Sequence, residues 1–184
     1  LFLVDATPVV IAGTHGKTTT TALTAFLLHS CGLRPGMLVG GVARNFKATY
    51  LIGAPGAPVV VEGDEYDTAF FDKGPKFLHY LPTSAAITNI EFDHADIYAD
   101  IEAIEAAFTR FVLTVPERGR LLIPHGSERP GRVAERAQAT VWTFGLEAEA
   151  DIRASDVQVD ADGTHFTLHL PEAEPVVTRL SIWG

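Results

Sequence analysis

The segment that follows the apolar residues 9–12 has the residue types, in the same order, of a loop that binds polyphosphate. It reads Gly-Thr-His-Gly-Lys-Thr over residues 13–18 and continues into a helix-like pattern. The two glycines allow the backbone to turn with its N–H groups pointing inward, and the helix brings the positive end of its dipole to the same point. Lys17 supplies a charge for the terminal phosphates, and the hydroxyl group of Thr18 is a ligand for Mg²⁺.

The spacing of the glycines departs from the usual phosphate loop. That loop has four residues between its two glycines, which would require a glycine at the position of Ile11, whereas only two residues separate Gly13 from Gly16. The shorter turn argues against ordinary GTPases and favours a family with its own variant of the loop. The structural alternative is a strand–turn–helix connection that contains Gly-Lys-Thr by chance.

Polar side chains also follow two later apolar runs, where strands are expected to end. Glu62 comes directly after three consecutive valines, and Asn89 and His94 follow the next apolar run. Because the carboxyl ends of parallel strands share one edge of a sheet, we expect Glu62, His94 and Thr18 to converge. A carboxylate at that edge suits Mg²⁺ bound to a nucleotide, although histidine is a less typical ligand of this ion.

Each of these polar groups also has a purely structural interpretation. A solvated loop is the ordinary interpretation of the acids that follow Glu62, which are Asp64, Glu65 and Asp67. Asp93 and His94 could form the N-cap and first turn of the following helix. Asn89 could form hydrogen bonds with backbone groups at the end of a strand. His15 can shape the turn without taking part in chemistry.

The elements that must position these residues alternate between strands and helices. The expected strands cover residues 9–12, 37–41, 58–62, 85–89, 120–124 and 140–144, and the expected helices cover residues 18–31, 101–112 and 133–138. This alternation predicts an α/β fold of the P-loop type, a doubly wound, mostly parallel sheet flanked by helices. Alternating runs on both sides of Asp162-Gly163 predict a hairpin, and with residues 176–183 a small antiparallel sheet beside the main one.

The composition is typical of one globular domain. The chain has 184 residues, of which 47% are hydrophobic, and its net charge of −9 comes without the basic cluster that nucleic-acid binding requires. The single cysteine, Cys31, excludes an internal disulfide, and we expect it to be a small buried residue. We find no apolar stretch long enough for a membrane span and expect no membrane partner. The missing initiator methionine and the strand-like end predict that the chain is a piece of a longer protein.

The combined motifs resemble the central ATPase domain of the Mur ligases, cytoplasmic bacterial enzymes that add amino acids or peptides to UDP-N-acetylmuramic acid. The resemblance covers nearly the whole chain and is carried by residues 13–20, by Glu62 and by the segment Asn-Ile-Glu-Phe-Asp-His at 89–94. Residues 62–73, with Lys-Phe at 76–77 and His-Tyr at 79–80, are similar to the branch that serves peptidoglycan recycling. That branch joins UDP-N-acetylmuramate to the tripeptide L-alanyl-γ-D-glutamyl-meso-diaminopimelate, and the alanine-adding branch has a shorter segment here.

The resemblance implies an ADP-forming ligase that uses ATP and Mg²⁺ and proceeds through an acyl phosphate. It assigns catalytic roles to Lys17, Glu62 and His94 and Mg²⁺ ligation to Thr18, Glu62 and His94. The nucleotide contacts that it implies are Gly13, Thr14, His15, Gly16, Lys17, Thr18, Thr19 and Asn89. Residues 101–111 contain no lysine, so the carbamylated lysine of several Mur ligases is expected to be absent.

The resemblance also implies that residues 1–184 are the central domain of a full-length chain whose amino-terminal domain binds the UDP moiety and whose carboxyl-terminal domain closes over ATP. We therefore expect the isolated domain to bind nucleotide weakly and not to ligate. Other functions stay open. They are UDP-N-acetylmuramate–L-alanine ligase, a nucleotide-binding switch module that needs neither His94 nor the carboxylate of Glu62, and folylpolyglutamate synthase, which should lack the acidic string.

Overall fold

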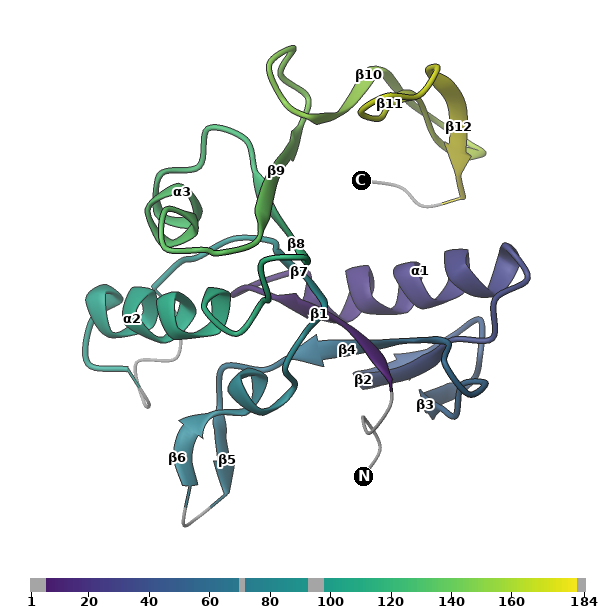
Figure 1. The fold of residues 1–184 in the computed structure, drawn as a ribbon. Coiled ribbons are helices and arrows are strands. Elements are labelled where there is room, and N and C mark those ends of the chain that lie inside the picture. The colour runs from purple at the N-terminus through teal and green to yellow at the C-terminus, as the bar shows by residue number, and fades with distance from the viewer. Residues whose placement is uncertain (1–5, 70–71, 93–97, 182–184) are drawn as a thin grey trace.

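The chain forms a mixed β-sheet with α-helices packed on its faces (Figure 1). The computed structural model describes residues 6–69, 72–92 and 98–181. In chain order the strands are β1 (Thr7–Ala12), β2 (Gly36–Ala43), β3 (Ala48–Leu51), β4 (Pro58–Gly63), β5 (Asp67–Ala69), β6 (Asp72–Pro75), β7 (Ser84–Ile87), β8 (Arg120–Pro124), β9 (Thr140–Gly145), β10 (Ile152–Asp160), β11 (Gly163–His169) and β12 (Val176–Leu180). The helices are α1 (Lys17–Ser30), α2 (Ile101–Val112), α3 (Glu128–Ala134) and the 3₁₀ helix η1 (Lys76–His79).

The strand order confirms the predicted fold class. The main sheet has the order β12-β11-β10-β9-β8-β7-β1-β4-β2-β3, and β5 and β6 form a separate hairpin. Strands β9, β8, β7, β1, β4 and β2 are parallel to one another. After β1 the chain crosses to β2 on one side, and after β4 it crosses to β7 on the other side. The carboxyl end of β1 is therefore the point where the strand order reverses, which is where ligands bind in open α/β sheets.

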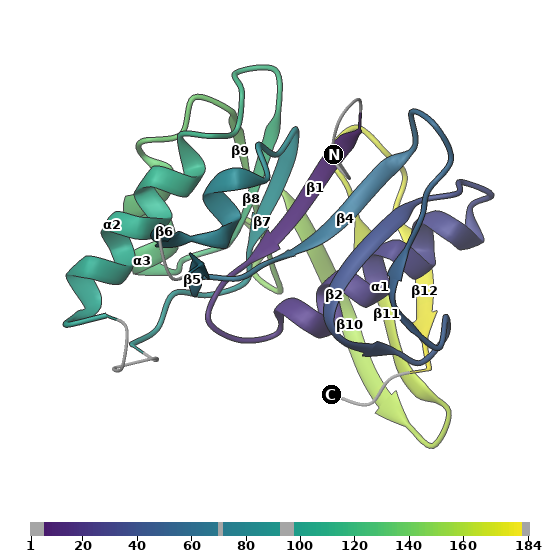
Figure 2. The ribbon, with the colours of Figure 1, turned by 90° about the horizontal axis from the view of Figure 1, so that it is seen from below.

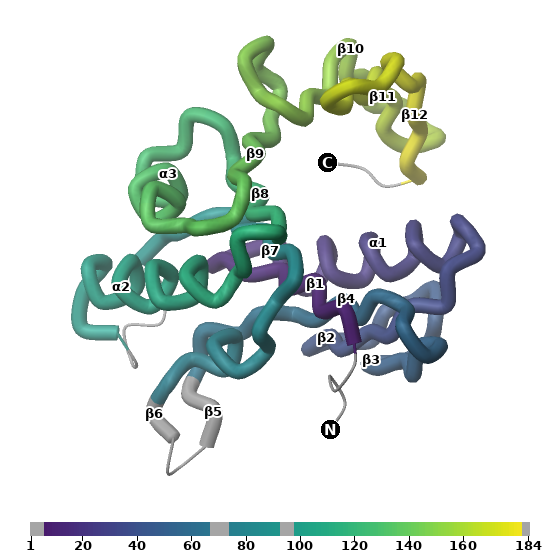
Figure 3. The backbone as a smooth tube through the Cα atoms, viewed as in Figure 1, coloured from purple at the N-terminus to yellow at the C-terminus, as the bar shows by residue number. Residues whose placement is uncertain are grey.

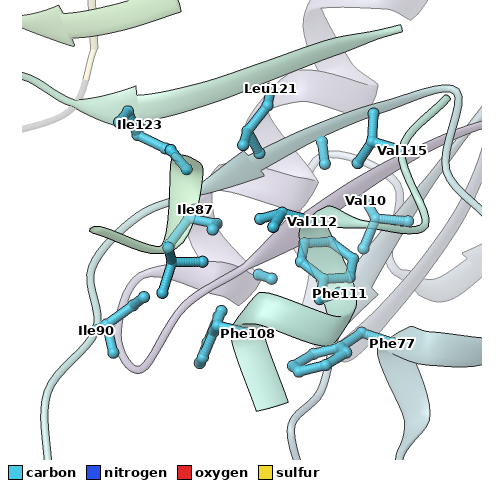
Figure 4. Packing of buried hydrophobic residues seen from close by; sticks show 14 of the residues in the cluster. Val10, Phe77, Ile87, Ile90, Phe108, Phe111, Val112, Val115, Leu121 and Ile123 are labelled. Atoms are coloured by element: carbon cyan, nitrogen blue, oxygen red, sulfur yellow. The ribbon is translucent and has the colours of Figure 1, made fainter. Parts of the chain in front are cut away.

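The two faces of the sheet carry separate hydrophobic cores because successive side chains of a strand point to opposite faces. On one face Val10 and Val61 pack with Phe77 of η1 and with Phe108 and Phe111 of α2 (Figure 4). On the opposite face Ile11, Val60 and Met37 pack against α1 through Ala25. Helices α2 and α3 thus cover one face, and α1 covers the other (Figure 1). The strand β1 that leads into the glycine turn is buried from both sides.

The carboxyl-terminal antiparallel strands differ from the predicted arrangement. We expected a small sheet beside the main one, but β10 continues the main sheet by pairing in parallel with β9, through Ile152 opposite Phe144 and Arg153 opposite Gly145. The Asp-Gly hairpin itself is confirmed as the β10–β11 pair. The sheet curls, so that β10–β12 lie over the side that carries α1 (Figures 2 and 3).

Two further expectations were wrong in detail, and three short strands were not predicted. The helix expected at residues 133–138 lies at Glu128–Ala134 instead, because Pro130 falls in its first turn, where proline is tolerated. Strands β3, β5 and β6 were not predicted, since runs of three or four residues are too short to show a periodicity. Cys31 is exposed and not buried, because it caps the end of α1.

Candidate functional site

The glycine turn after β1 has the backbone geometry that its sequence predicts. Gly13 has a φ of 132°, and Gly16, which caps α1, has a φ of 80°. Both values lie in the region that favours glycine. A Cβ atom on Gly13 would also collide with the Thr88 hydroxyl and approach the amide nitrogen of Asn89 to 3.0 Å. Gly13 therefore allows the turn to pass close to the segment that follows β7.

The segment after β7 holds the turn in place through hydrogen bonds. The Thr14 amide donates to the Asn89 carbonyl at 3.2 Å, and the His15 amide donates to Asn89 Oδ1 at 2.8 Å. The Thr88 hydroxyl donates to the His15 carbonyl at 2.6 Å, and the Thr14 hydroxyl accepts from the Glu91 amide at 2.9 Å. Asn89 thus binds the backbone of the loop, as its structural interpretation proposed. A contact of Asn89 with nucleotide stays a prediction.

These bonds show which amides are left for an anion. Since Thr14 and His15 donate to Asn89, the inward-pointing donors come from the start of α1, whose first amides have no partner within the helix. Gly16, Lys17, Thr18 and Thr19 supply these groups at the positive end of the helix dipole. The helix start is the part of the loop that could bind a phosphate group.

Lys17 lies folded back onto the loop in this structure. Its ammonium donates to the carbonyl oxygens of Gly13 at 2.7 Å and Thr14 at 3.1 Å, and it lies 3.0 and 2.9 Å from the two carboxylate oxygens of Glu65. The Lys17 side chain is 12% exposed and that of Glu65 is 3% exposed. The interpretation of Glu65 as a solvated acid is therefore wrong: it is the buried counter-ion of the loop lysine.

The predicted meeting of Thr18 with Glu62 is present in the structure. The Thr18 hydroxyl donates to Glu62 Oε1 at 2.8 Å, and the Gly40 amide donates to Glu62 Oε2 at 2.6 Å. Thr18 is exposed and Glu62 is half-buried, so the pair lies at the protein surface. A carboxylate and a hydroxyl group, with further positions left to water and phosphate, are the hard oxygen donors that Mg²⁺ prefers. The donor set fits this ion.

His94, the third predicted member of the site, lies outside the described residues, together with Asp93. The segment that leads toward it, residues 89–92, reaches the glycine turn through Asn89 and Glu91. Within the described residues no group of three or more His, Cys, Asp and Glu side chains is arranged to hold a metal ion. The role of His94 stays a prediction.

Two cavities border the Thr18–Glu62 pair. One of about 170 Å³ is lined by Gly40, Glu62, Asp64, Lys76 and Tyr80, and one of about 280 Å³ runs from Thr18 and Thr19 along α1 to Phe26 and Phe46. In the first cavity Lys76 lies 2.7 Å from Asp64, and this hydrogen bond raises the pKa of the ammonium group above its ordinary value. Burial raises the pKa of the Tyr80 phenol. Both groups therefore stay protonated near neutral pH.

The sequence interpretation missed two groups of this site, Gly40 and Glu65. The signal for Gly40 was the pair of glycines inside β2, since glycine in a strand can mark a close approach. A Cβ atom on Gly40 would lie 3.3 and 3.4 Å from the carboxylate oxygens of Glu62, and one on Gly41 would lie 3.4 Å from Thr18 Cγ2. Nothing in the acidic string distinguished Glu65 from its neighbours.

No helix in the described parts of the chain has the length and apolar character that crossing a membrane would require.

Known proteins are similar to this chain in sequence and fold. The sequence profile of the Mur ligase middle domain matches residues 11–184. The chain is 47% identical over 114 residues to the UDP-N-acetylmuramate–L-alanyl-gamma-D-glutamyl-meso-2,6-diaminoheptandioate ligase of Escherichia coli (strain K12). This match covers 62% of this chain and 25% of the relative. The chain is 37% identical over 172 residues to the UDP-N-acetylmuramate–L-alanine ligase of Chlorobium phaeobacteroides (strain BS1), covering 94% of this chain and 35% of the relative.

Among solved structures, the chain is similar to the UDP-N-acetylmuramate:L-alanyl-gamma-D-glutamyl-meso-diaminopimelate ligase from Neisseria meningitides. The TM-score is 0.85 at 35% sequence identity, and the match covers 99% of this chain and 57% of that one. The chain spans between 25% and 35% of the length of the two curated relatives described above.

Proposed function

The chain belongs to the Mur ligase family, and from this premise we propose that residues 1–184 are the central ATP-binding domain of a longer, ADP-forming ligase. The proposed reaction joins UDP-N-acetylmuramate to the tripeptide L-alanyl-γ-D-glutamyl-meso-diaminopimelate in the bacterial cytoplasm, and it serves peptidoglycan recycling. One observation carries the proposal: the Thr18 hydroxyl and the Glu62 carboxylate lie 2.8 Å apart beside the glycine turn. The named substrates of the Escherichia coli and Neisseria meningitides relatives support the choice of substrates.

The proposed reaction has two chemical steps. A carboxylate oxygen of the lactyl group attacks the γ-phosphorus of ATP, and the bond from that phosphorus to the β,γ-bridging oxygen breaks, which gives an acyl phosphate and ADP. The α-amine of the tripeptide then attacks the acyl carbon, loses a proton, and displaces inorganic phosphate. Both steps move negative charge, so the protein can assist chiefly by positioning and by electrostatic stabilisation.

The described residues have separate roles in this proposal. The first amides of α1 bind phosphate oxygens, and Lys17 offsets the charge of the transferring phosphoryl group. Thr18 and Glu62 hold Mg²⁺, and the resemblance adds His94 as a ligand of a second Mg²⁺. When bound, Mg²⁺ neutralises charge on the β- and γ-phosphates. The hydrogen bond that Asn89 Oδ1 accepts from the His15 amide and the one that the Thr88 hydroxyl donates to the His15 carbonyl keep the turn in the shape that presents these groups.

Addition of free L-alanine is the alternative reaction. The 37% identity to the Chlorobium enzyme, over 94% of this chain, favours this second candidate. We expect the intact ligase, supplied with ATP, Mg²⁺ and UDP-N-acetylmuramate, to form the tripeptide product at least about tenfold faster than the alanine product, a discrimination of about 1.4 kcal/mol. Product formation would be followed by mass spectrometry of the two UDP-linked products.

Two results would contradict this assignment. Preference for L-alanine would replace the recycling reaction by the alternative, and no ligation with either acceptor would remove the ligase proposal. As a control, the isolated chain of residues 1–184 is expected to show no ligation above background, because the proposed reaction needs the domains that bind UDP and close over ATP.

The contact between Gly40 and Glu62 gives a further prediction. Gly40→Ala in the intact ligase is expected to raise the Mg²⁺ concentration needed for half-maximal activity by about tenfold, as loss of an outer-shell contact does at metal sites. The physical reason is that the added Cβ atom would crowd the carboxylate oxygens, at 3.3 and 3.4 Å, and displace them. Gly131→Ala is the matched control, since a Cβ atom there meets nothing within 4 Å. An unchanged Mg²⁺ requirement in Gly40→Ala would show that Gly40 does not position Glu62.

A further inference from the structure

The ammonium group of Lys17 is fully occupied in the structure. An ammonium has three donor protons, and Lys17 Nζ has the Gly13 carbonyl, the Thr14 carbonyl and the Glu65 carboxylate as acceptors, at 2.7, 3.1 and 2.9–3.0 Å. The two carbonyl oxygens belong to the turn itself, so these contacts can persist when a phosphate lies in the turn. The contact with Glu65 is the one that a phosphate oxygen would have to replace.

The backbone at Glu65 is held by hydrogen bonds and the Glu65 side chain is buried, which makes Lys17 the partner that moves in this inference. The Glu65 carbonyl accepts from the Tyr98 hydroxyl at 2.8 Å, and the carbonyl of the preceding Asp64 accepts from the amide of the fully buried Phe77 at 3.2 Å. The Glu65 side chain is itself only 3% exposed. Lys17, by contrast, carries its charge on a flexible four-carbon stem.

The Glu65 carboxylate and a bound phosphate group repel each other and need the same cation. Both are anions, and both would compete for one ammonium group in a site where 3% and 12% exposure leave little screening by water. A buried ion pair gives little net stability compared with apolar residues of the same size. The position of Glu65 against the loop lysine is therefore better explained by nucleotide binding than by folding.

We infer that Glu65 is a positioning residue that holds Lys17 on the turn between catalytic cycles and competes with the nucleotide phosphates for its ammonium group. This inference rests on the proposed function, since it needs the turn to bind ATP. On binding of ATP, one N–H group of the Lys17 ammonium donates its hydrogen bond to a phosphate oxygen instead of to the Glu65 carboxylate, and the return of Lys17 to Glu65 helps ADP to leave. Glu65 thus limits how tightly the product ADP binds.

The test is the affinity of the intact ligase for ADP with Mg²⁺, measured by titration calorimetry. Glu65→Gln is expected to bind MgADP at least about fivefold tighter than the wild type, the lower end of the usual coupling between linked interactions. Dissociation of ADP, measured by stopped-flow, should slow by a similar factor. A merely structural role predicts the opposite sign, because damage to the turn would weaken binding.

Glu105→Gln is the matched control, because Glu105 is also a partly buried carboxylate paired with cations, Arg129 and Arg132, on α2 and α3. Its MgADP affinity should stay within about twofold of the wild type. Equal or weaker binding by Glu65→Gln would overturn the inference and leave the proposed function intact. A wild-type ligase that binds no MgADP would overturn both.

A second measurement needs no variant and covers the case in which Glu65→Gln fails to fold. In a crystal structure of the wild-type ligase with MgADP, Lys17 Nζ should contact a phosphate oxygen and lie beyond hydrogen-bond distance from the Glu65 carboxylate. An ion pair of unchanged length in that complex would overturn the inference.

Discussion

Glu62→Gln in the intact ligase is expected to lower kcat at saturating ATP by roughly 10²–10³-fold, the usual cost of removing a group that stabilises charge in a transition state. The Glu62 carboxylate accepts hydrogen bonds from the Thr18 hydroxyl and the Gly40 amide, at 2.8 and 2.6 Å. Glutamine keeps the size of the side chain but removes the negative charge that Mg²⁺ requires. Steady-state ligation, measured as a function of Mg²⁺ concentration, tests the prediction.

The control for this variant is again Glu105→Gln, which removes a carboxylate of α2 that pairs with Arg132 of α3 and should leave kcat within about twofold. If the Glu62→Gln enzyme retained a kcat within about threefold of the wild type, Glu62 would have no part in holding Mg²⁺ during turnover. The switch-module alternative, which does not need this carboxylate, would then gain support.

Lys17→Met is expected to have two effects of different kinds. It should lower kcat/KM for ATP by roughly 10²–10³-fold, because the charge that offsets the phosphates is lost. It should also destabilise the protein by about 3–5 kcal/mol, because it leaves the buried Glu65 carboxylate without its ammonium partner. Steady-state kinetics measure the first effect, and denaturant unfolding measures the second.

The double variant Lys17→Met/Glu65→Gln separates these effects. Neutralising Glu65 should recover most of the lost stability and none of the lost rate, because the two residues are coupled in folding while Lys17 alone serves the phosphates. Arg132→Met is a control for removal of a cation, since Arg132 pairs with Glu105 and Glu128 at an exposed position. Recovery of ligation in the double variant would contradict the role given to Lys17.

The central part of the fold could be predicted from local sequence patterns, and the main pair of the site from those patterns together with a rule of sheet topology. The valine-rich strands, the amphipathic α2 and the Asp-Gly hairpin each carry a periodicity or turn signal of their own. The meeting of Thr18 and Glu62 followed from one topological rule, since β1 and β4 are parallel neighbours and both end at the same edge.

The rest depends on contacts that no local pattern encodes. Gly40 lies beside Glu62 because β2 runs parallel to β4 with Leu38 opposite Val61, a register set by tertiary packing. Glu65 is buried beside Lys17, whereas the neighbouring Asp64 is partly exposed and pairs with Lys76, and no local pattern separates the two acids. The attachment of β10 to β9 rests on two residue pairs, too few to leave a sequence signal.

The most direct test of the central claim is a crystal structure of the intact ligase with a non-hydrolysable ATP analogue and Mg²⁺. We expect the triphosphate at the start of α1, with Mg²⁺ about 2.1 Å from the Thr18 hydroxyl and from a Glu62 carboxylate oxygen. His94 should lie on the same side of the sheet, near the terminal phosphate. A triphosphate bound away from the glycine turn, or a Glu62 carboxylate that faces away from it, would contradict the account.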